Sequence, residues 1–179
     1  MTCKLFPMQT LSNFRKANPA IISFGATEIG PYYWVGQCKN GIDYYAGQTF
    51  KAPANGMLSR IKLFPSIVFG ATTATLSVYE FDQKNYSWRN KCAEATQFIT
   101  KGMEGNWINF DLRGLMVNKN YSYAFKISAK SGGMLAIAEC PWNIINPYAD
   151  GEEWIGSSQQ EEGNFHKDFD LAFEGEIEP

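Results

Sequence analysis

The sequence contains few of the residues that most often carry out catalysis. Histidine occurs once in 179 residues, as His166. A Ser-His-Asp or Cys-His site would depend on that one side chain, and a metal centre with several histidine ligands is excluded. The nucleophile motif G-x-S-x-G is also absent. We interpret His166 as a surface residue and expect a protein that is not an enzyme.

An excess of charge of one sign and long apolar runs are also missing. The chain carries 16 Lys and Arg against 18 Asp and Glu, for a formal net charge of -2. Nucleic-acid binding needs a clustered basic surface, so we expect no nucleic-acid partner. No apolar run reaches the ~18 residues that would cross a bilayer, and MTCKLFPMQTLSNF lacks the apolar core of a secretory signal. The sequence predicts neither a membrane span nor a signal peptide in this numbering.

The cysteines are widely separated. Cys3, Cys38, Cys92 and Cys140 form no C-x-x-C pattern of a zinc or redox site. Four cysteines can form about three complete sets of disulfide pairs, and the spacing does not distinguish among these sets. Buried free thiols are the favoured interpretation. We predict no metal ligands and no cofactor from these side chains.

Aromatic residues, by contrast, are abundant, at 15% of the chain. The clearest strand pattern runs from Asn106 to Ile127, where apolar and polar residues alternate on both sides of a short link. Period-two alternation indicates strands with one buried face. The link contains Gly114 and Asn118-Lys119-Asn120, so we expect the chain to reverse there and the two strands to form a pair. The side chains expected to point inward are Ile108, Phe110, Leu112, Tyr121, Tyr123, Phe125 and Ile127.

Most of the remaining chain also has the character of short strands. Ile61 and Leu63 are expected to point inward, as are Leu76 and Val78. Residues 65–70 and 82–91 are expected to be loops, and residues 140–166 show little periodicity. About eight to ten strands separated by Gly, Pro and Asn turns, without an amphipathic helix, predict an all-β fold. The expected architecture is an antiparallel β-sandwich of jelly-roll type.

One domain is predicted for residues 1–179. The length suits a single core, and neither an internal repeat nor a low-complexity linker divides the chain. Residues 45–175 are expected to form the core jelly roll. Residues 1–30 are expected to be an N-terminal extension or the first strand, with a helical turn at 11–17 and a strand at 20–24.

Several motifs between residues 45 and 175 are similar to those of a known group of modules. The chain resembles the jelly-roll modules found beside cell-wall anchors and glycosidases in bacterial surface proteins, which are similar to carbohydrate-binding, galactose-binding-like domains. The resemblance implies a non-catalytic module at an extracellular or cell-surface location. It departs from the group in its cysteines and in having no visible catalytic or anchoring partner. The motifs are Gln48-Thr49-Phe50-x-Ala52-Pro53, Gly56-x-Leu58-x-x-Ile61-x-Leu63, Leu76-x-Val78-Tyr79, Trp107-Ile108-x-Phe110, Tyr121-x-Tyr123-Ala124, Asn146-Pro147-Tyr148-Ala149-x-Gly151-x-x-Trp154 and Asp170-Leu171-Ala172-Phe173.

The stretch from Cys140 to Trp154, CPWNIINPYADGEEW, is the predicted ligand site. Long loops on a rigid scaffold commonly carry binding groups. A sugar needs a flat ring against its C–H face, together with amides or carboxylates that bind its hydroxyls. This loop offers such groups, and a second set lies on another loop. The predicted ligand residues are Trp142, Asn143, Asn146, Tyr148, Asp150 and Trp154, with Trp88 and Arg89 in the second set.

The same residues also permit other roles. A tryptophan in a long loop often folds back to cap a sandwich, and we favour this role for Trp154. Trp142 and Tyr148 fit either role. The carboxylates of Asp150, Glu152 and Glu153 are candidate ligands for a structural Ca²⁺, which the resemblance to carbohydrate-binding jelly rolls implies. The EF-hand spacing is absent.

Sequence and resemblance together predict a non-catalytic module that binds a glycan through loop aromatics and polar side chains. The alternative is a structural or protein–protein interaction domain of a surface or tail-like assembly, in which exposed rings form an interface. A glycoside hydrolase that uses paired acids from residues 140–154 is a third hypothesis. The expected partner is accordingly a carbohydrate or a protein.

Overall fold

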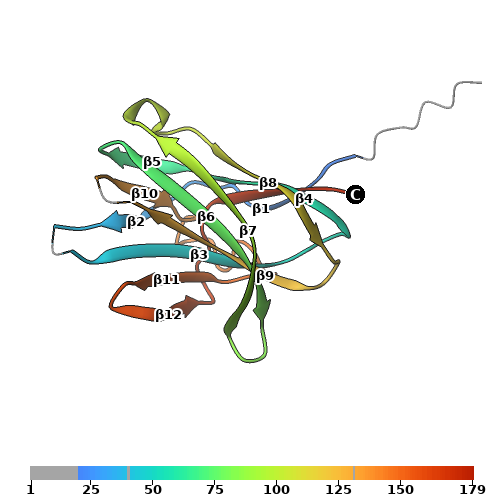
Figure 1. The fold of residues 1–179 in the computed structure, drawn as a ribbon. Helices are drawn as coiled ribbons and strands as arrows, with labels where there is room; N and C mark the ends of the chain where they lie inside the picture. The colour runs from blue at the N-terminus through green and yellow to red at the C-terminus, as the bar shows by residue number, and fades with distance from the viewer. Residues whose placement is uncertain (1–19, 40, 131) are drawn as a thin grey trace, which may run out of the picture.

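A computed structural model describes residues 20–39, 41–130 and 132–179. Within these ranges there are thirteen strands and one short 3-10 helix, η1 (Lys101–Met103). The strands form two antiparallel sheets (Figure 1), which confirms the predicted β-sandwich of jelly-roll type. No helix in these ranges is long and apolar enough to cross a membrane. The helical turn predicted at residues 11–17 lies outside the described residues.

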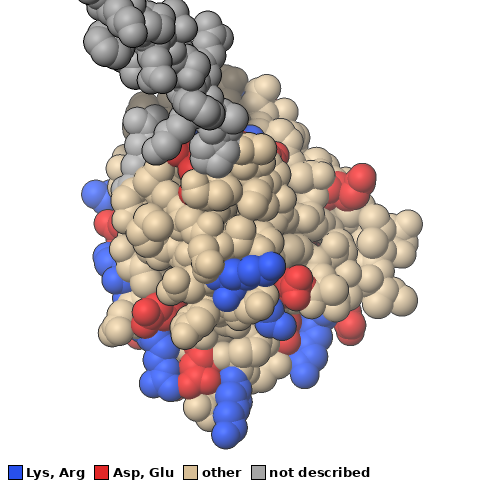
Figure 2. Space-filling model, turned by 90° about the vertical axis from the view of Figure 1, so that its right-hand side faces the viewer, with Lys and Arg blue, Asp and Glu red and all other residues tan. Residues whose placement is uncertain are grey.

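The smaller sheet has four strands in the order β1-β13-β4-β8. Its outer face carries acids and bases in alternation: Lys62 Nζ lies 3.1 Å from Glu174 Oε1 and 2.6 Å from Glu176 Oε1. Opposite charges on neighbouring strands stabilise their pairing. On the side of the molecule shown in Figure 2, basic and acidic side chains are likewise interspersed. The bounds are β1 (Ile22–Ala26), β4 (Gly56–Leu63), β8 (Ile108–Val117) and β13 (Phe173–Glu178).

The larger sheet has nine strands and branches at β3 (Asp43–Lys51). One edge of β3 pairs first with β2 and then with β9, and its other edge pairs with β11. From this branch β2 leads to β10 and β5, β9 leads to β6 and β7, and β11 leads to β12. The bounds are β2 (Tyr32–Gln37), β5 (Pro65–Phe69), β6 (Thr72–Asp82), β7 (Ser87–Ile99), β9 (Ser122–Ala129), β10 (Met134–Ala138), β11 (Glu153–Ser157) and β12 (Gln160–His166).

The two strands with the clearest sequence pattern do not pair with each other. β8 pairs with β4 in the smaller sheet, whereas β9 pairs with β3 and β6 in the larger one. The expected pairing is therefore wrong, because the link carries the chain from one sheet to the other. The Asn118 N–H donates to the hydroxyl oxygen of Tyr123 (3.1 Å), which holds this crossing. The inward orientation predicted for these side chains is confirmed except at Tyr121, which is 66% exposed, and Ala124, on the opposite face of β9, is buried as well.

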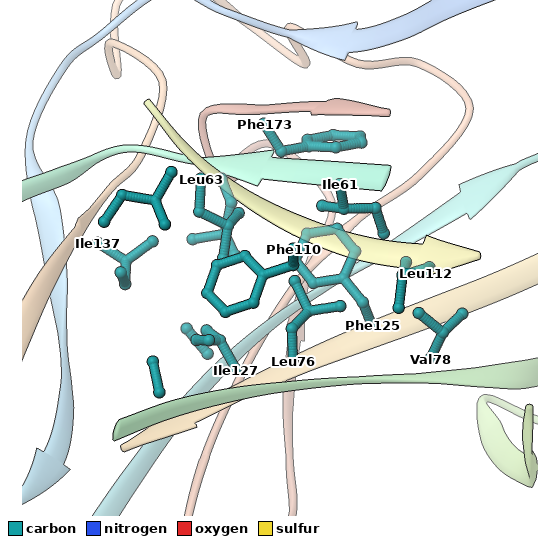
Figure 3. Close-up of a cluster of buried hydrophobic side chains, with 14 of the residues drawn as sticks. Ile61, Leu63, Leu76, Val78, Phe110, Leu112, Phe125, Ile127, Ile137 and Phe173 are labelled. Atoms are coloured by element: carbon teal, nitrogen blue, oxygen red, sulfur yellow. The ribbon is translucent and has the colours of Figure 1, made fainter. Parts of the chain in front are cut away.

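The core lies between the sheets and is built from alternate residues of both (Figure 3). Phe125 of β9 and Phe173 of β13 have ring centroids 5.5 Å apart, and both side chains are 0% exposed. Burial of large rings supplies much of the hydrophobic stabilisation of such a sandwich. The inward orientation predicted for Ile61, Leu63, Leu76 and Val78 is confirmed.

The loops expected at residues 65–70 and 82–91 are wrong in large part, because both segments contain strand residues, and the aperiodic segment 140–166 also ends in two strands. Residues 65–70 contain β5, where Pro65 occupies the first position, at which the missing N–H is tolerated. Residues 82–91 belong to the β6–β7 hairpin, and residues 153–166 form the β11–β12 hairpin. Most side chains in residues 87–92 of β7 and in β12 are exposed or half-buried, so these stretches show no regular burial alternation, whereas residues 93–99 of β7 do alternate.

The described cysteines, Cys38, Cys92 and Cys140, are free thiols. Cys140 is buried, and this burial together with nearby acids raises its pKa to about 12. Cys92 is exposed and Cys38 is half-buried. The expectation of buried thiols therefore holds for Cys140 and is wrong for Cys92, which lies on a solvent-facing strand. Cys3 lies outside the described residues.

Phe125→Ala is expected to lower the free energy of unfolding by about 3–5 kcal/mol, because it leaves a cavity between the sheets. Tyr121→Ala removes an exposed ring just before β9 and should change the free energy of unfolding by less than about 0.5 kcal/mol. Urea unfolding followed by circular dichroism measures both. Similar losses for the two variants would contradict the assignment of buried and exposed faces.

Candidate functional site

The predicted ligand loop ends in β11, a strand that separates two cavities. β11 lies between β3 and β12 (Figure 1), with Trp154 opposite Gly47 and Glu153 opposite Gln48 and His166. Successive side chains of a strand point to opposite faces. Trp154 and Glu153 therefore line different cavities.

Buried hydrogen bonds between Gln48 and Asp170 hold this region together. Gln48 Nε2 donates to Asp170 Oδ1 at 2.6 Å, and Gln48 Oε1 accepts from the Leu171 N–H at 2.9 Å. Asp170 Oδ2 accepts from the Tyr148 N–H at 2.9 Å. Gln48 is 0% and Asp170 1% exposed. Since buried polar groups persist when they are hydrogen-bonded, these contacts fix the loop against β3.

The first cavity, called here the Trp88–Trp154 cavity, has a volume of about 230 Å³. The two indole rings meet edge to face with centroids 5.1 Å apart, and Trp154 Nε1 donates to the carbonyl oxygen of Glu162 at 2.9 Å. A Cβ at Gly47 would lie 2.5 Å from the Phe125 carbonyl oxygen and 3.2 Å from the Trp154 ring. Only glycine therefore fits between the backbone of β9 and the Trp154 ring at this position. The lining residues are Tyr45, Tyr79, Trp88, Lys126, Trp154 and Glu161.

Lys126 and Glu161 add charge to this aromatic cavity. The Lys126 Nζ lies 4.9 Å from the centroid of the Tyr45 ring, a cation–π contact. Burial lowers the pKa of Lys126, while Glu161 acts in the opposite direction. Rings combined with a few charged groups suit a ligand that has both apolar and hydroxyl surfaces.

The second cavity, called here the Glu139–Glu153 cavity, has a volume of about 160 Å³. Glu153 is 3% exposed, and its Oε1 has no hydrogen-bond partner among the described residues. Glu139 Oε2 accepts from Trp142 Nε1 at 3.0 Å. Burial, followed by repulsion from Glu139 and Asp170, raises the pKa of Glu153 to about 8. The lining residues are Tyr33, Glu139, Trp142, Glu153, Ile155, His166 and Phe169.

A third hollow, called here the aromatic face, is lined by residues of β2, β5 and β10, the strands at the left of Figure 1, together with Cys38 and with Tyr44 of β3. Its volume is about 510 Å³. Phe69 is 70% and Tyr32 42% exposed, and Tyr32 packs edge to face on Trp34 with centroids 5.5 Å apart. The lining residues are Tyr32, Tyr33, Trp34, Cys38, Tyr44, Phe69 and Met134, none of which is an acid or a basic residue.

The predicted ligand residues do not form one site. Trp88 and Trp154 lie together, and the burial of Trp154 fits the capping role. Trp142 is 66% exposed at the Glu139–Glu153 cavity. Tyr148 packs edge to face on Phe173 with centroids 5.1 Å apart, so its ring extends the core.

The other predicted ligand residues lie apart from these cavities. Asn143, Asn146 and Asp150 are exposed on the loop. Arg89 forms an ion pair with Asp82 in the β6–β7 hairpin, and this contact lowers the pKa of Asp82 to about 2. The predicted ligand residues are therefore distributed over separate surfaces of the domain.

The three acids considered as Ca²⁺ ligands diverge. Glu153 lines its cavity, Glu152 Oε1 accepts from the Tyr86 hydroxyl at 3.0 Å, and Asp150 Oδ1 lies 3.9 Å from Lys51 Nζ. Within the described ranges, no group of three or more His, Cys, Asp or Glu residues is placed to hold a metal ion. This arrangement does not fit Ca²⁺, which takes about six to eight oxygen ligands.

Sequence reasoning missed several polar residues of the cavities. Lys126 and Glu161 belong to strands whose partners the sequence did not reveal. Glu139 directly follows the apolar stretch MLAIA, and an acid at the end of a buried strand could have marked it as a candidate site residue. His166, interpreted as a surface residue, is half-buried and its Nε2 has no hydrogen-bond partner among the described residues. Pairing with β11 explains this correction, because it turns His166 toward Glu153.

Stability should fall as pH rises from about 5 to about 9, because buried acids must then release protons. The pKa values of Asp170 and Glu153 are raised to about 6 and about 8, so the folded chain holds protons that the unfolded chain has lost. The stabilisation is full below the ordinary carboxyl pKa and is lost as pH passes through the raised values.

Glu153→Gln should flatten the upper part of this decline in thermal unfolding measured across the pH series. Glu162→Gln, which changes an exposed acid on the neighbouring strand, serves as the control. An unchanged pH slope in Glu153→Gln would show that Glu153 is not the group responsible.

No protein-family model and no curated protein matches the chain. Among solved structures, it is similar to a mutant VP2 protein of infectious bursal disease virus, at 14% identity over 97% of this chain and 44% of that chain, with a TM-score of 0.37. A VP2 subviral particle of the same virus gives 11% identity, 96% and 45% coverage and a TM-score of 0.38. The enzymatically active domain of bacteriophage CBA120 tailspike protein 4 is 16% identical over 68% of this chain and 18% of that chain, with a TM-score of 0.27. The chain thus spans less than half the length of the viral proteins it matches, and we draw no functional conclusion from them.

Proposed function

We propose that this domain is a non-catalytic interaction module that associates with a second copy of itself through the aromatic face. The observation that carries the proposal is the exposure of large rings on one sheet surface, with Phe69 70% and Tyr32 42% exposed. Large contiguous apolar patches on a protein surface commonly mark interaction sites. Aromatic residues are also enriched among the residues that dominate interface energies.

The chemistry of the aromatic face favours a protein surface over a sugar. A sugar requires amides or carboxylates for its hydroxyls, and no lining residue of the face supplies one. The outer face of the smaller sheet is different, because Lys62, Glu174 and Glu176 form an ion-pair ladder there. Water solvates that ladder well, whereas the aromatic face gains from being covered.

Two features favour a second copy as the partner. The face has no charged lining residue, so two copies can meet about a two-fold axis without opposing like charges. The adjoining strand edge is already occupied: the Val68 N–H donates to Glu104 Oε2 at 2.8 Å, and the Gly105 N–H donates to the Pro65 carbonyl at 2.9 Å. These contacts disfavour growth of the sheet by edge pairing, which directs association to the face.

Phe69→Ser is expected to weaken self-association about tenfold or more, because it removes an exposed ring from the centre of the contact. Phe98→Ser is the matched control, since Phe98 is 63% exposed on β7 and is not a lining residue of the face. Sedimentation equilibrium over a range of concentrations measures the association of each. A wild-type protein that stays monomeric throughout, or equal effects of the two variants, would overturn the proposal.

A saccharide ligand is the second candidate, and the Trp88–Trp154 cavity favours it. Here the edge-to-face rings of Trp88 and Trp154 adjoin Lys126 and Glu161, which can bind hydroxyls, as sugar recognition requires. The site differs from the predicted one because it uses Trp88 and Trp154 without the exposed asparagines of the loop. Binding would involve stacking and hydrogen bonds and no covalent step.

Titration of a panel of neutral and acidic oligosaccharides against intrinsic tryptophan fluorescence tests this candidate. A saturable change should occur in wild type and in Trp142→Phe, whose indole lies at the other cavity. It should weaken about tenfold or more in Trp88→Ala, because base-stacking and ring-stacking contacts of this size contribute about 1–3 kcal/mol. If no saccharide in the panel gives a saturable response, the cavity does not serve this function.

A further inference from the structure

We propose that the Glu139–Glu153 cavity binds the primary ammonium group of an alkylamine. The cavity brings two acids, a phenol and an imidazole together with the rings of Trp142 and Phe169. A primary ammonium has three N–H donors and a positive charge. It therefore matches a site that offers unused acceptors at its base and aromatic surface at its walls.

The unused acceptors are the first part of the argument. Glu153 is only 3% exposed, yet its Oε1 has no hydrogen-bond partner among the described residues. His166 Nε2, directly across the β11–β12 pairing, is also buried without a partner. Buried polar atoms in native proteins are nearly always paired with protein, water or a ligand. Two residues with such atoms line one cavity, which favours a hydrogen-bonding ligand there.

The second part is the sign of the charge that the cavity can accept. Glu139 adds a second carboxyl, held by the Trp142 indole N–H at 3.0 Å. No Lys or Arg lines the cavity. Two neighbouring carboxyls disfavour an anion and gain from a cation placed between them. Trp142, 66% exposed at this cavity, offers a ring face to the cation or to its alkyl chain.

The third part is the choice among cations. A divalent metal needs more oxygen ligands than this cavity offers, and no metal-like cluster occurs among the described residues. The volume of about 160 Å³ is also well below the roughly 300 Å³ at which pockets for larger organic ligands begin. An ammonium on a short alkyl chain satisfies both limits, with Ile155 and Phe169 providing apolar contact.

Binding should displace a proton. Burial, Glu139 and Asp170 hold the pKa of Glu153 at about 8, so its carboxyl is protonated at neutral pH until a cation arrives. The groups around it are Gln48 on β3, Tyr33 on β2 and His166 on β12, together with Glu139 and Asp170. None of these is a Lys or an Arg. Affinity for the ammonium is therefore expected to rise as pH increases through the pKa of Glu153.

The test is a titration with n-butylammonium chloride, followed by the NMR signal of the Trp142 indole N–H, which reports directly on the contact with Glu139. The expected result is a saturable shift that strengthens with pH. 1-Butanol, of similar shape and without charge, should give none, and tetramethylammonium, which has no N–H donor, should bind more weakly. A second titration, with Nα-acetyl-lysinamide, distinguishes two origins of the ammonium group. Binding of this compound would assign the group to a lysine side chain, and absence of binding would assign it to a free alkylamine.

Glu153→Gln should weaken n-butylammonium binding about tenfold or more, because a charge-assisted hydrogen bond is lost. Glu162→Gln, an exposed acid on β12, should leave it unchanged. Equal responses to n-butylammonium and 1-butanol, or no saturable shift, would overturn the proposal. If Glu153→Gln proves unfolded by circular dichroism, the wild-type pH series decides, and an affinity that does not rise with pH rejects the role of Glu153.

Discussion

The hydrogen bonds of Gln48 with Asp170 and Leu171 are the contacts on which the rest of this region depends. They join the centre of β3 to the segment that enters β13, and Asp170 in turn fixes Tyr148 in the long loop. With the loop held at both ends, β11 can pair with β3 in a single register. The position of both cavities follows from that register, because each takes one side of β11 as a wall.

The sequence allowed the fold class to be predicted because alternation is a local property. Ile108 and Phe110 are buried on β8, and Phe125 and Ile127 on β9, as the period-two pattern requires. Alternation does not say which strand lies alongside. The polar link before Tyr123 has the composition of a hairpin turn, yet it crosses between sheets, since partner choice depends on contacts with residues far away in the chain.

The candidate sites were less predictable for the same reason. Aromatic composition was enough to single out Trp88 and Trp154, which do meet. It favoured a capping role for Trp154 and left the role of Trp142 open, because the exposure of each ring depends on which strand or loop lies beneath it. Glu153 was considered as a Ca²⁺ ligand and His166 only as a surface residue, because their shared cavity exists only once strand pairing places them opposite each other.

The alternation of β11 has a consequence for how this protein can change. A slip or insertion of one residue in this strand would exchange its two sides. The Glu153 carboxyl would then lie among the rings beside Trp88, and the Trp154 indole would press on Gln48. Both cavities would fail together, although they share no lining residue. A change in length within β11 would therefore alter both cavities together, whereas one at the turn of the hairpin would leave the register of β11 on β3 in place.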